Sequence, residues 1–193
     1  MLPLARLLRG LSEILVTIDR WLMTLLIGMV AVLVLANAGA RAAGYTVAWA
    51  DELAIRSMIL AAFLGAALLF RMRRDPSVQI LQDFVPSGVA RALRIVASLA
   101  GLTFAVVLLW LCWRWFDPLA FAAAGFDVRA FQMATGNFIY SDTTPVMGVP
   151  STLFFVVVPW FAFTMTVHAL ANLIEDAGIL PARRAGPGEA VTA

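Results

Sequence analysis

The residues of this chain that are best placed to do chemistry lie together near position 50. Asp51 and Glu52 are acidic, Arg56 is basic, and Trp49 stands just before them. If the segment is helical, Glu52 and Arg56 have the spacing and order that favour an ion pair on one helix face. Acidic residues in a first turn also suit the positive end of the helix dipole. The cluster therefore predicts either the charged cap of a helix entry or a polar contact with another membrane subunit.

Other reactive side chains are few. The chain holds one histidine, His168, and one cysteine, Cys112. Metal and haem sites usually draw on several such ligands, and no nucleophile–base set, phosphate-binding loop or dinucleotide motif is present. The sequence therefore predicts no metal, no cofactor, no catalytic residue and no enzymatic activity. His168 is expected to form a hydrogen bond between packed helices.

A basic group follows at positions 71 to 74. Arg71, Arg73 and Arg74 come directly after an apolar run. Arginines at the end of a span mark the cytoplasmic side, and such a cluster also attracts anionic lipid headgroups. Further along, Leu81 and Phe84 belong to an amphipathic pattern. We expect these five residues to anchor the chain, through a short helix, in the cytoplasmic interface.

These groups must be positioned by membrane helices, because the composition leaves few alternatives. Hydrophobic residues make up 62% of the 193 residues and charged residues 13%, against roughly 25% charged residues in soluble domains. One domain cannot hide so much apolar surface from water. We expect an all-α integral membrane fold with four transmembrane helices and a short interfacial helix between the second and third. The sequence has no basic stripe of the kind that binds nucleic acid, so no nucleic-acid partner is expected.

Uncharged stretches place the four spans. They predict helices over about 20–41, 51–70, 94–115 and 150–174, since a hydrocarbon layer of ~30 Å takes about 20 helical residues. Pro159 lies inside the fourth span and is expected to kink it. The first span also has features of a cleaved signal peptide, but its apolar stretch is longer than the ~7–15 residues of such segments.

Arginine placement orients these spans. The two tails and the second connection hold ten arginines, and the first and third connections hold three. Positive residues accumulate on the cytoplasmic side, so both termini are expected there. Residues 1–176 would form a single four-helix domain, and 177–193 a flexible cytoplasmic tail. The connection over about 117–149 carries five aromatic residues without obvious structure, which suggests packing against the outer membrane surface or a partner.

Together, these features resemble the small membrane subunit, of DctQ type, of tripartite ATP-independent periplasmic transporters, called TRAP transporters. The resemblance covers roughly residues 12–176, and the connection between the third and fourth helices is longer than is usual in that family. Order and spacing of the motifs carry it: Trp49 to Arg56 opening the second helix, Phe63 to Ala67 within it, Thr144 to Pro150 before the fourth helix, and Pro159 within that helix.

The resemblance implies a non-catalytic scaffold subunit in the inner membrane of a bacterium. Its implied partners are the lipid bilayer, a large multi-helix TRAP membrane subunit that holds the sodium and substrate sites, and a periplasmic substrate-binding protein that captures an organic acid. Trp49, Asp51, Glu52 and Arg56 would help to fix the second helix. From the residues alone, two other functions stay open: a stand-alone small membrane channel or transporter, and a membrane anchor subunit of a redox enzyme.

Overall fold

The structure is a computed structural model that describes residues 2–72 and 85–181. The described residues form helices and one isolated β-bridge, between Thr143 and Pro150, but no strand. The all-α expectation is therefore confirmed. The helices in chain order are α1 (Leu2–Ala42), α2 (Ala48–Met72), α4 (Ser87–Phe116), α5 (Pro118–Ala123), α6 (Val128–Thr135), α7 (Thr152–Phe155) and α8 (Val157–Asp176).

The expectation of four transmembrane helices is also confirmed. α1 begins at Leu2, so the helix extends ahead of the span expected from about residue 20. Arg9, Glu13 and Asp19 in this extension contact other helices and do not end it. Four stretches of the described chain are long and apolar enough to cross a membrane: Leu2–Ala42, Ala48–Met72, Gly88–Ala123 and Thr152–Asp176.

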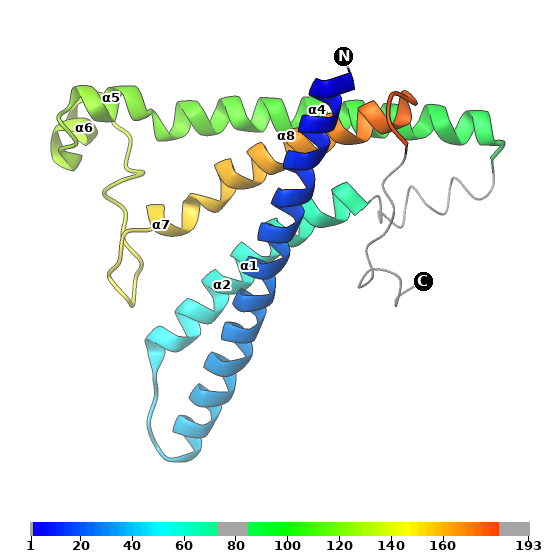
Figure 1. Cartoon of the computed structure of the whole chain (residues 1–193). Helices are drawn as coiled ribbons and strands as arrows, with labels where there is room; N and C mark the ends of the chain where they lie inside the picture. The colour runs from blue at the N-terminus through cyan, green and yellow to red at the C-terminus, as the bar shows by residue number, and fades with distance from the viewer. Residues whose placement is uncertain (1, 73–84, 182–193) are drawn as a thin grey trace.

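Figure 1 shows two helix pairs that meet near the N-terminus and spread apart from there. α1 and α2 lie antiparallel along each other, and α8 lies along α4. α8 also contacts α1 and α2, and so joins the two pairs. We call the region where the start of α1 meets the ends of α2 and α8 and the start of α4 the terminal end. The opposite region, with the α1–α2 connection and the segment leading into α7, is the hairpin end.

A glycine permits a close approach at the terminal end. A Cβ atom added to Gly101 of α4 would lie 2.4 Å from the ring of Phe70 in α2. That separation is far below a normal carbon–carbon contact. The position therefore requires glycine for Phe70 to pack as it does.

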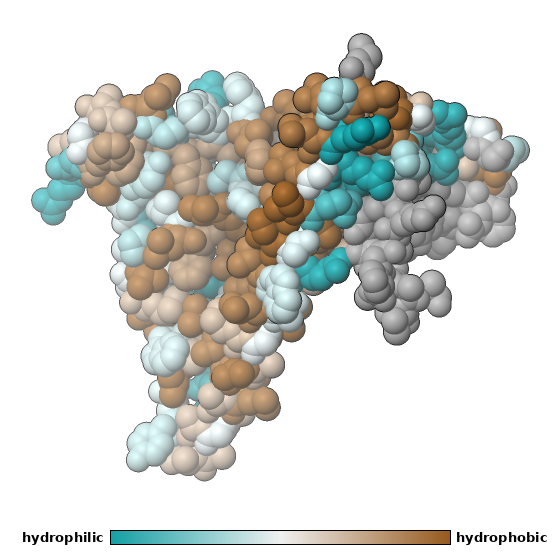
Figure 2. All heavy atoms as spheres, viewed as in Figure 1, coloured by the Kyte–Doolittle hydropathy of each residue, from teal (hydrophilic) through white to brown (hydrophobic). Residues whose placement is uncertain are grey.

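The surface of the helices is apolar, while many buried side chains are polar, which reverses the pattern of a water-soluble protein. Trp21 and Leu35 of α1 are 72% and 73% exposed, whereas Asp19 of the same helix is 0% exposed. Figure 2 shows apolar side chains spread along the α1–α2 pair and over the face below α4. Lipid, rather than water, suits such a surface.

The fourth span is interrupted. α7 ends at Phe155 and α8 begins at Val157, so the break falls at Val156. Pro159 has no N–H group to donate to the carbonyl of Phe155, four residues earlier. The irregularity therefore lies one turn before Pro159, where the missing hydrogen bond belongs.

The sequence assigned no helix to the connection over 117–149, although its aromatic residues suggested packing. The connection contains α5 and α6, whose first turns are capped by the side chains of Asp117 and Asp127. The rings of Phe121, Phe131 and Tyr140 pack together between them, with Phe121 stacked on Tyr140 at 4.0 Å. Helices this short have no long apolar period, so their sequence signal is limited to local caps.

The interfacial helix expected near 77–85 lies almost entirely outside the described residues. Four of its expected anchors, Arg73, Arg74, Leu81 and Phe84, lie outside them as well. Their anchoring role stays a prediction.

Candidate functional site

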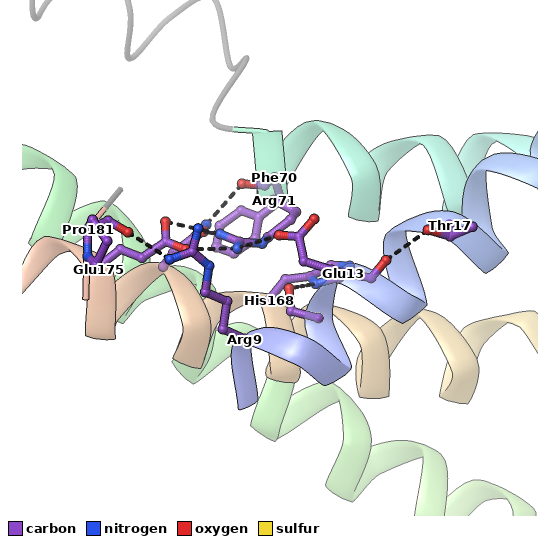
Figure 3. A network of polar contacts seen from close by, with 10 residues as sticks. Arg9, Glu13, Thr17, Phe70, Arg71, His168, Glu175 and Pro181 are labelled. Carbon is purple, nitrogen blue, oxygen red and sulfur yellow. Dashed lines mark hydrogen bonds and ion pairs between the residues drawn. The ribbon is translucent and has the colours of Figure 1, made fainter. Parts of the chain in front are cut away.

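Arg71, in the last turn of α2, lies at the centre of a buried ionic network at the terminal end. Its side chain is 0% exposed. Nη2 donates to Glu175 Oε1 at 2.8 Å and Nη1 approaches Glu175 Oε2 at 3.3 Å, so the two groups face each other as a bidentate pair. Nη2 also donates to Glu13 Oε1 at 3.0 Å. One guanidinium thus joins α1, α2 and α8 (Figure 3).

Asn172 of α8 completes the surroundings of that guanidinium. Its Oδ1 accepts from Arg71 Nη1 at 2.6 Å, and its Nδ2 donates to the backbone carbonyl of Phe70 at 3.1 Å. The second bond satisfies one of the carbonyls that the end of α2 leaves without a helical partner. Arg71 and Asn172 therefore fix the end of α2 against α8 through both side chain and backbone.

Arg9 of α1 extends the network towards the end of the described chain. Its Nε lies 4.0 Å from Glu175 Oε1, and Nη1 donates to the carbonyl of Pro181 at 3.1 Å. Leu180 beside it is buried. These contacts fix the chain as far as Pro181. The expectation of a flexible tail over 177–193 stays a prediction, because residues 182–193 lie outside the described part.

Two further polar contacts join α1 to α8 at deeper levels. Ser12 Oγ and His168 Nδ1 form a buried hydrogen bond of 2.9 Å, the kind of contact expected of this histidine. Trp160 Nε1 donates to Asp19 Oδ1 at 2.8 Å. Because α1 and α8 run in opposite directions, these contacts and the Arg9–Glu175 contact form a ladder along the two helices.

α4 joins the terminal end through the last residue of α8. Asp176 accepts from Ser98 Oγ at 3.3 Å and lies 3.6 Å from Arg94 Nε. Arg91 Nε donates to the backbone carbonyl of Asp176 at 2.9 Å. Two arginines at the carbonyl end of α8 also favour its helix dipole.

A second cluster holds the hairpin end and includes the residues that the sequence singled out. Glu52 Oε2 accepts from the backbone N–H groups of Val146 and Met147, at 3.0 and 2.9 Å. Arg56 lies 3.5 Å from Glu52 and over the ring of Phe154. The expected pairing of Glu52 with Arg56 is present, and Glu52 in addition ties α2 to the turn that precedes the fourth span.

Asp51 and Trp49 occupy less enclosed places in that cluster. Asp51 Oδ1 accepts from Asn37 Nδ2, and Oδ2 pairs with Arg41 Nη2, both at 2.5 Å. Asp51 therefore links the start of α2 to the end of α1. Trp49 is exposed. Contacts of these residues with another subunit remain a proposal.

Arg71 is the residue for which expectation and position differ most. It was expected to help anchor the chain in the cytoplasmic interface, and its guanidinium lies among carboxylates of two other helices. The anchoring role stays a prediction. The partners Glu13 and Glu175 were not singled out in the sequence. The available signal was positional, because Glu175 directly follows an uncharged run, as Arg71 does.

These arrangements bind helices together rather than perform a reaction. Within residues 2–72 and 85–181, no group of three or more His, Cys, Asp or Glu side chains could hold a metal ion. The network's carboxylates face arginines, a serine and a tryptophan, and the Ser12–His168 pair is fully buried between α1 and α8, where no substrate reaches it. Buried ionic groups of this kind act as interhelical ties whose loss leaves an uncompensated charge.

Comparison with known proteins places this geometry in a family. No curated protein and no solved structure gave a significant match. A family model for the DctQ component of tripartite ATP-independent periplasmic transporters matches residues 29–178. The match includes Arg71, Asn172 and Glu175, and excludes the first half of α1 with Glu13. Because it covers well over half of the 193 residues, the chain belongs to the DctQ component family of tripartite ATP-independent periplasmic transporters.

Proposed function

We propose that this DctQ component is a scaffold without a transport site of its own. The family is non-enzymatic, and its tripartite architecture implies a large membrane component, DctM, and a periplasmic component, DctP. In our proposal the chain holds the frame in which DctM moves an organic acid, delivered by DctP, together with sodium. The coupling ion and the substrate class rest on the family resemblance.

The observation that carries this proposal is the Arg71 network. A transporter needs elements that move relative to one another and polar or unwound segments near mid-membrane for its substrate. Here the buried guanidinium contacts α1, α2 and α8 at once, through Glu13, Glu175 and Asn172. Separating any of these helices would leave a charge without its partner in an apolar setting, so the three behave as one body.

We further propose that both termini lie in the cytoplasm, in the inner membrane of a bacterium. The arginine asymmetry supports this orientation. The terminal end would then face the cytoplasm, and α5, α6 and the turn held by Glu52 would face the periplasm. Reporter fusions test it: alkaline phosphatase fused after Gly136 should be active, and a fusion at the C-terminus should be inactive. The reverse pattern would refute the orientation.

Reconstitution tests the scaffold. Proteoliposomes are prepared with this chain alone, with DctM alone and with both, and each set receives DctP, a sodium gradient and a panel of radiolabelled organic acids. We expect uptake only when both membrane components are present. Substrate-dependent uptake by this chain with DctP but without DctM would refute the scaffold and support a stand-alone transporter.

A further inference from the structure

The outward face of α1 carries an apolar seam that no other described element covers. Its members recur at alternating intervals of three and four residues, and all are exposed except Leu11, which is half-buried. We call this set the α1 seam: Leu4, Leu7, Leu11, Ile14, Ile18, Trp21, Leu25, Gly28, Val32, Leu35 and Gly39.

The first half of α1 shows that water does not face this seam. Arg9, Ser12, Glu13 and Asp19 turn towards α2 and α8, where they form the contacts described above. Leucines and isoleucines occupy the opposite side of the same turns. Amphipathic helices of soluble proteins point their apolar side inward; here the polar side points inward, so the apolar side needs a covering from outside the chain.

The length and shape of the seam indicate a protein helix rather than lipid. From Leu4 to Gly39 it extends about 52 Å at ~1.5 Å per residue, whereas the hydrocarbon layer is about 30 Å thick. The three–four spacing, kept over the whole length, is the pattern by which two helices pack in a left-handed pair. Gly28 and Gly39 form open notches in it, with nothing within 4 Å of an added Cβ. Such notches admit side chains of a neighbouring helix.

A second copy of this chain fits the seam poorly. Copies inserted in the same orientation would pair their α1 helices in parallel, with each residue opposite its equivalent. Trp21, 72% exposed, would then meet Trp21 and keep the two helices apart, while Gly28 two turns further on would face Gly28 across a gap that closes only if the helices approach closely. A complementary partner has a small residue opposite Trp21 and large residues opposite the glycines.

We propose that the α1 seam is the surface against which a transmembrane helix of the large membrane component packs. The inference rests on the proposed function, because it takes DctM as the partner. It adds the face of contact and the side-chain sizes that the partner helix must present.

Site-specific photo-crosslinking tests the proposal on the full complex. A photoreactive phenylalanine analogue is placed at the seam positions Leu25 and Val32, both 66% exposed, and at the matched positions Ile27 and Val34, 54% and 52% exposed on another face of α1. Each variant is co-expressed with DctM and DctP, purified by a tag on this chain and irradiated. We expect crosslinks to DctM from Leu25 and Val32 and a marked loss of them at Ile27 and Val34.

Three other outcomes would contradict the seam as a contact surface, its occupant, or the proposed function. Crosslinks to DctM that arise equally or preferentially at Ile27 and Val34 refute the seam while leaving the scaffold function intact. A product at twice the 20.9 kDa of the chain assigns the seam to a second copy. Purification without any DctM refutes the proposed function and the seam together.

A size substitution gives an independent readout. Gly28→Leu fills a notch of the seam, and Ala38→Leu, also exposed, enlarges α1 on another side. We expect Gly28→Leu to lose co-purified DctM while the helix content and monodispersity of the chain itself stay unchanged, and Ala38→Leu to retain it. Equal retention by both variants would refute the seam as the contact surface.

Discussion

At the terminal end, the side chains of Arg71 and Glu175 are 0% and 1% exposed, whereas Arg41 and Asp51 at the hairpin end are 56% and 45% exposed. Both are arginine–carboxylate pairs that join helices. Arg71 forms a bidentate pair with Glu175 of α8 and also contacts a third helix, α1, through Glu13. Arg41 meets one carboxylate within a single helix hairpin. The contacts at the terminal end therefore stabilise the packing of three helices, whereas the Arg41–Asp51 pair at the hairpin end stabilises only the local α1–α2 connection.

Glu52 lies between these extremes. It is largely enclosed, like Glu175 at the terminal end, but its main partners are the backbone N–H groups of Val146 and Met147. Its loss should release a segment rather than separate helices. Substitutions at the two ends should therefore differ in the size of the stability loss and in its kind: separation of helices at the terminal end and local loosening of a segment at the hairpin end.

The largest effect is expected at Arg71. Arg71→Met leaves Glu175 and Glu13 without their shared cation, which should reduce the free energy of unfolding by about 3–5 kcal/mol. Denaturant titration of the purified chain in detergent, followed by circular dichroism, measures it. Arg71→Met combined with Glu175→Met should recover much of the loss, because the fully buried carboxylate is then removed, while the carboxylate of Glu13 is 39% exposed and can be solvated. If the two substitutions simply add, the buried pair is not what distinguishes the terminal end.

A smaller and local effect is expected at Glu52. Glu52→Gln weakens two charge-assisted hydrogen bonds and the contact with Arg56, with a cost of about 1.5–3 kcal/mol. Amide hydrogen exchange should accelerate over residues 144–149 and remain unchanged near Arg71. Acceleration spread equally over both ends would contradict a local role for Glu52.

Packing at the terminal end predicts a comparable effect without any change of charge. Gly101→Ala places a methyl group 2.4 Å from the ring of Phe70, and overpacking of this kind costs about 1–3 kcal/mol. Thermal unfolding in detergent measures the loss. A second substitution, Phe70→Leu, removes the obstructing ring and should restore part of the stability. If the Gly101→Ala variant is as stable as the parent, α2 and α4 can shift apart at little cost and the close packing is not required.

The smallest effect is expected at Arg41. Arg41→Gln removes an exposed ion pair, and such pairs contribute roughly 0–1 kcal/mol. Asn37 still donates to Asp51 in this variant. The same denaturant titration serves as the measurement, with Arg71→Met as reference. A loss at Arg41 equal to that at Arg71 would remove the contrast between the two ends.

Much of the fold follows from local sequence. Uncharged runs predicted four spans, and four helices long and apolar enough to cross a membrane are present. The spacing of Glu52 and Arg56 predicted their pair. The buried network did not follow, because Glu13, Arg71 and Glu175 are far apart in the chain and each resembles an ordinary charge at a helix end. The early start of α1 was missed for the same reason, since charges that turn inward look in sequence like charges that end a span.

The sequence by itself determined that the helices suit a lipid bilayer and how many of them are long enough to span it, because both depend on composition and on runs of apolar residues. Tertiary structure alone decided which charges from different helices meet. Whether Arg71 faces lipid headgroups or the carboxylates of Glu13 and Glu175 depends on how α1, α2 and α8 pack, and an ionic contact is set by distance and burial rather than by residue type. The same packing decides which face of α1 is left open for a partner.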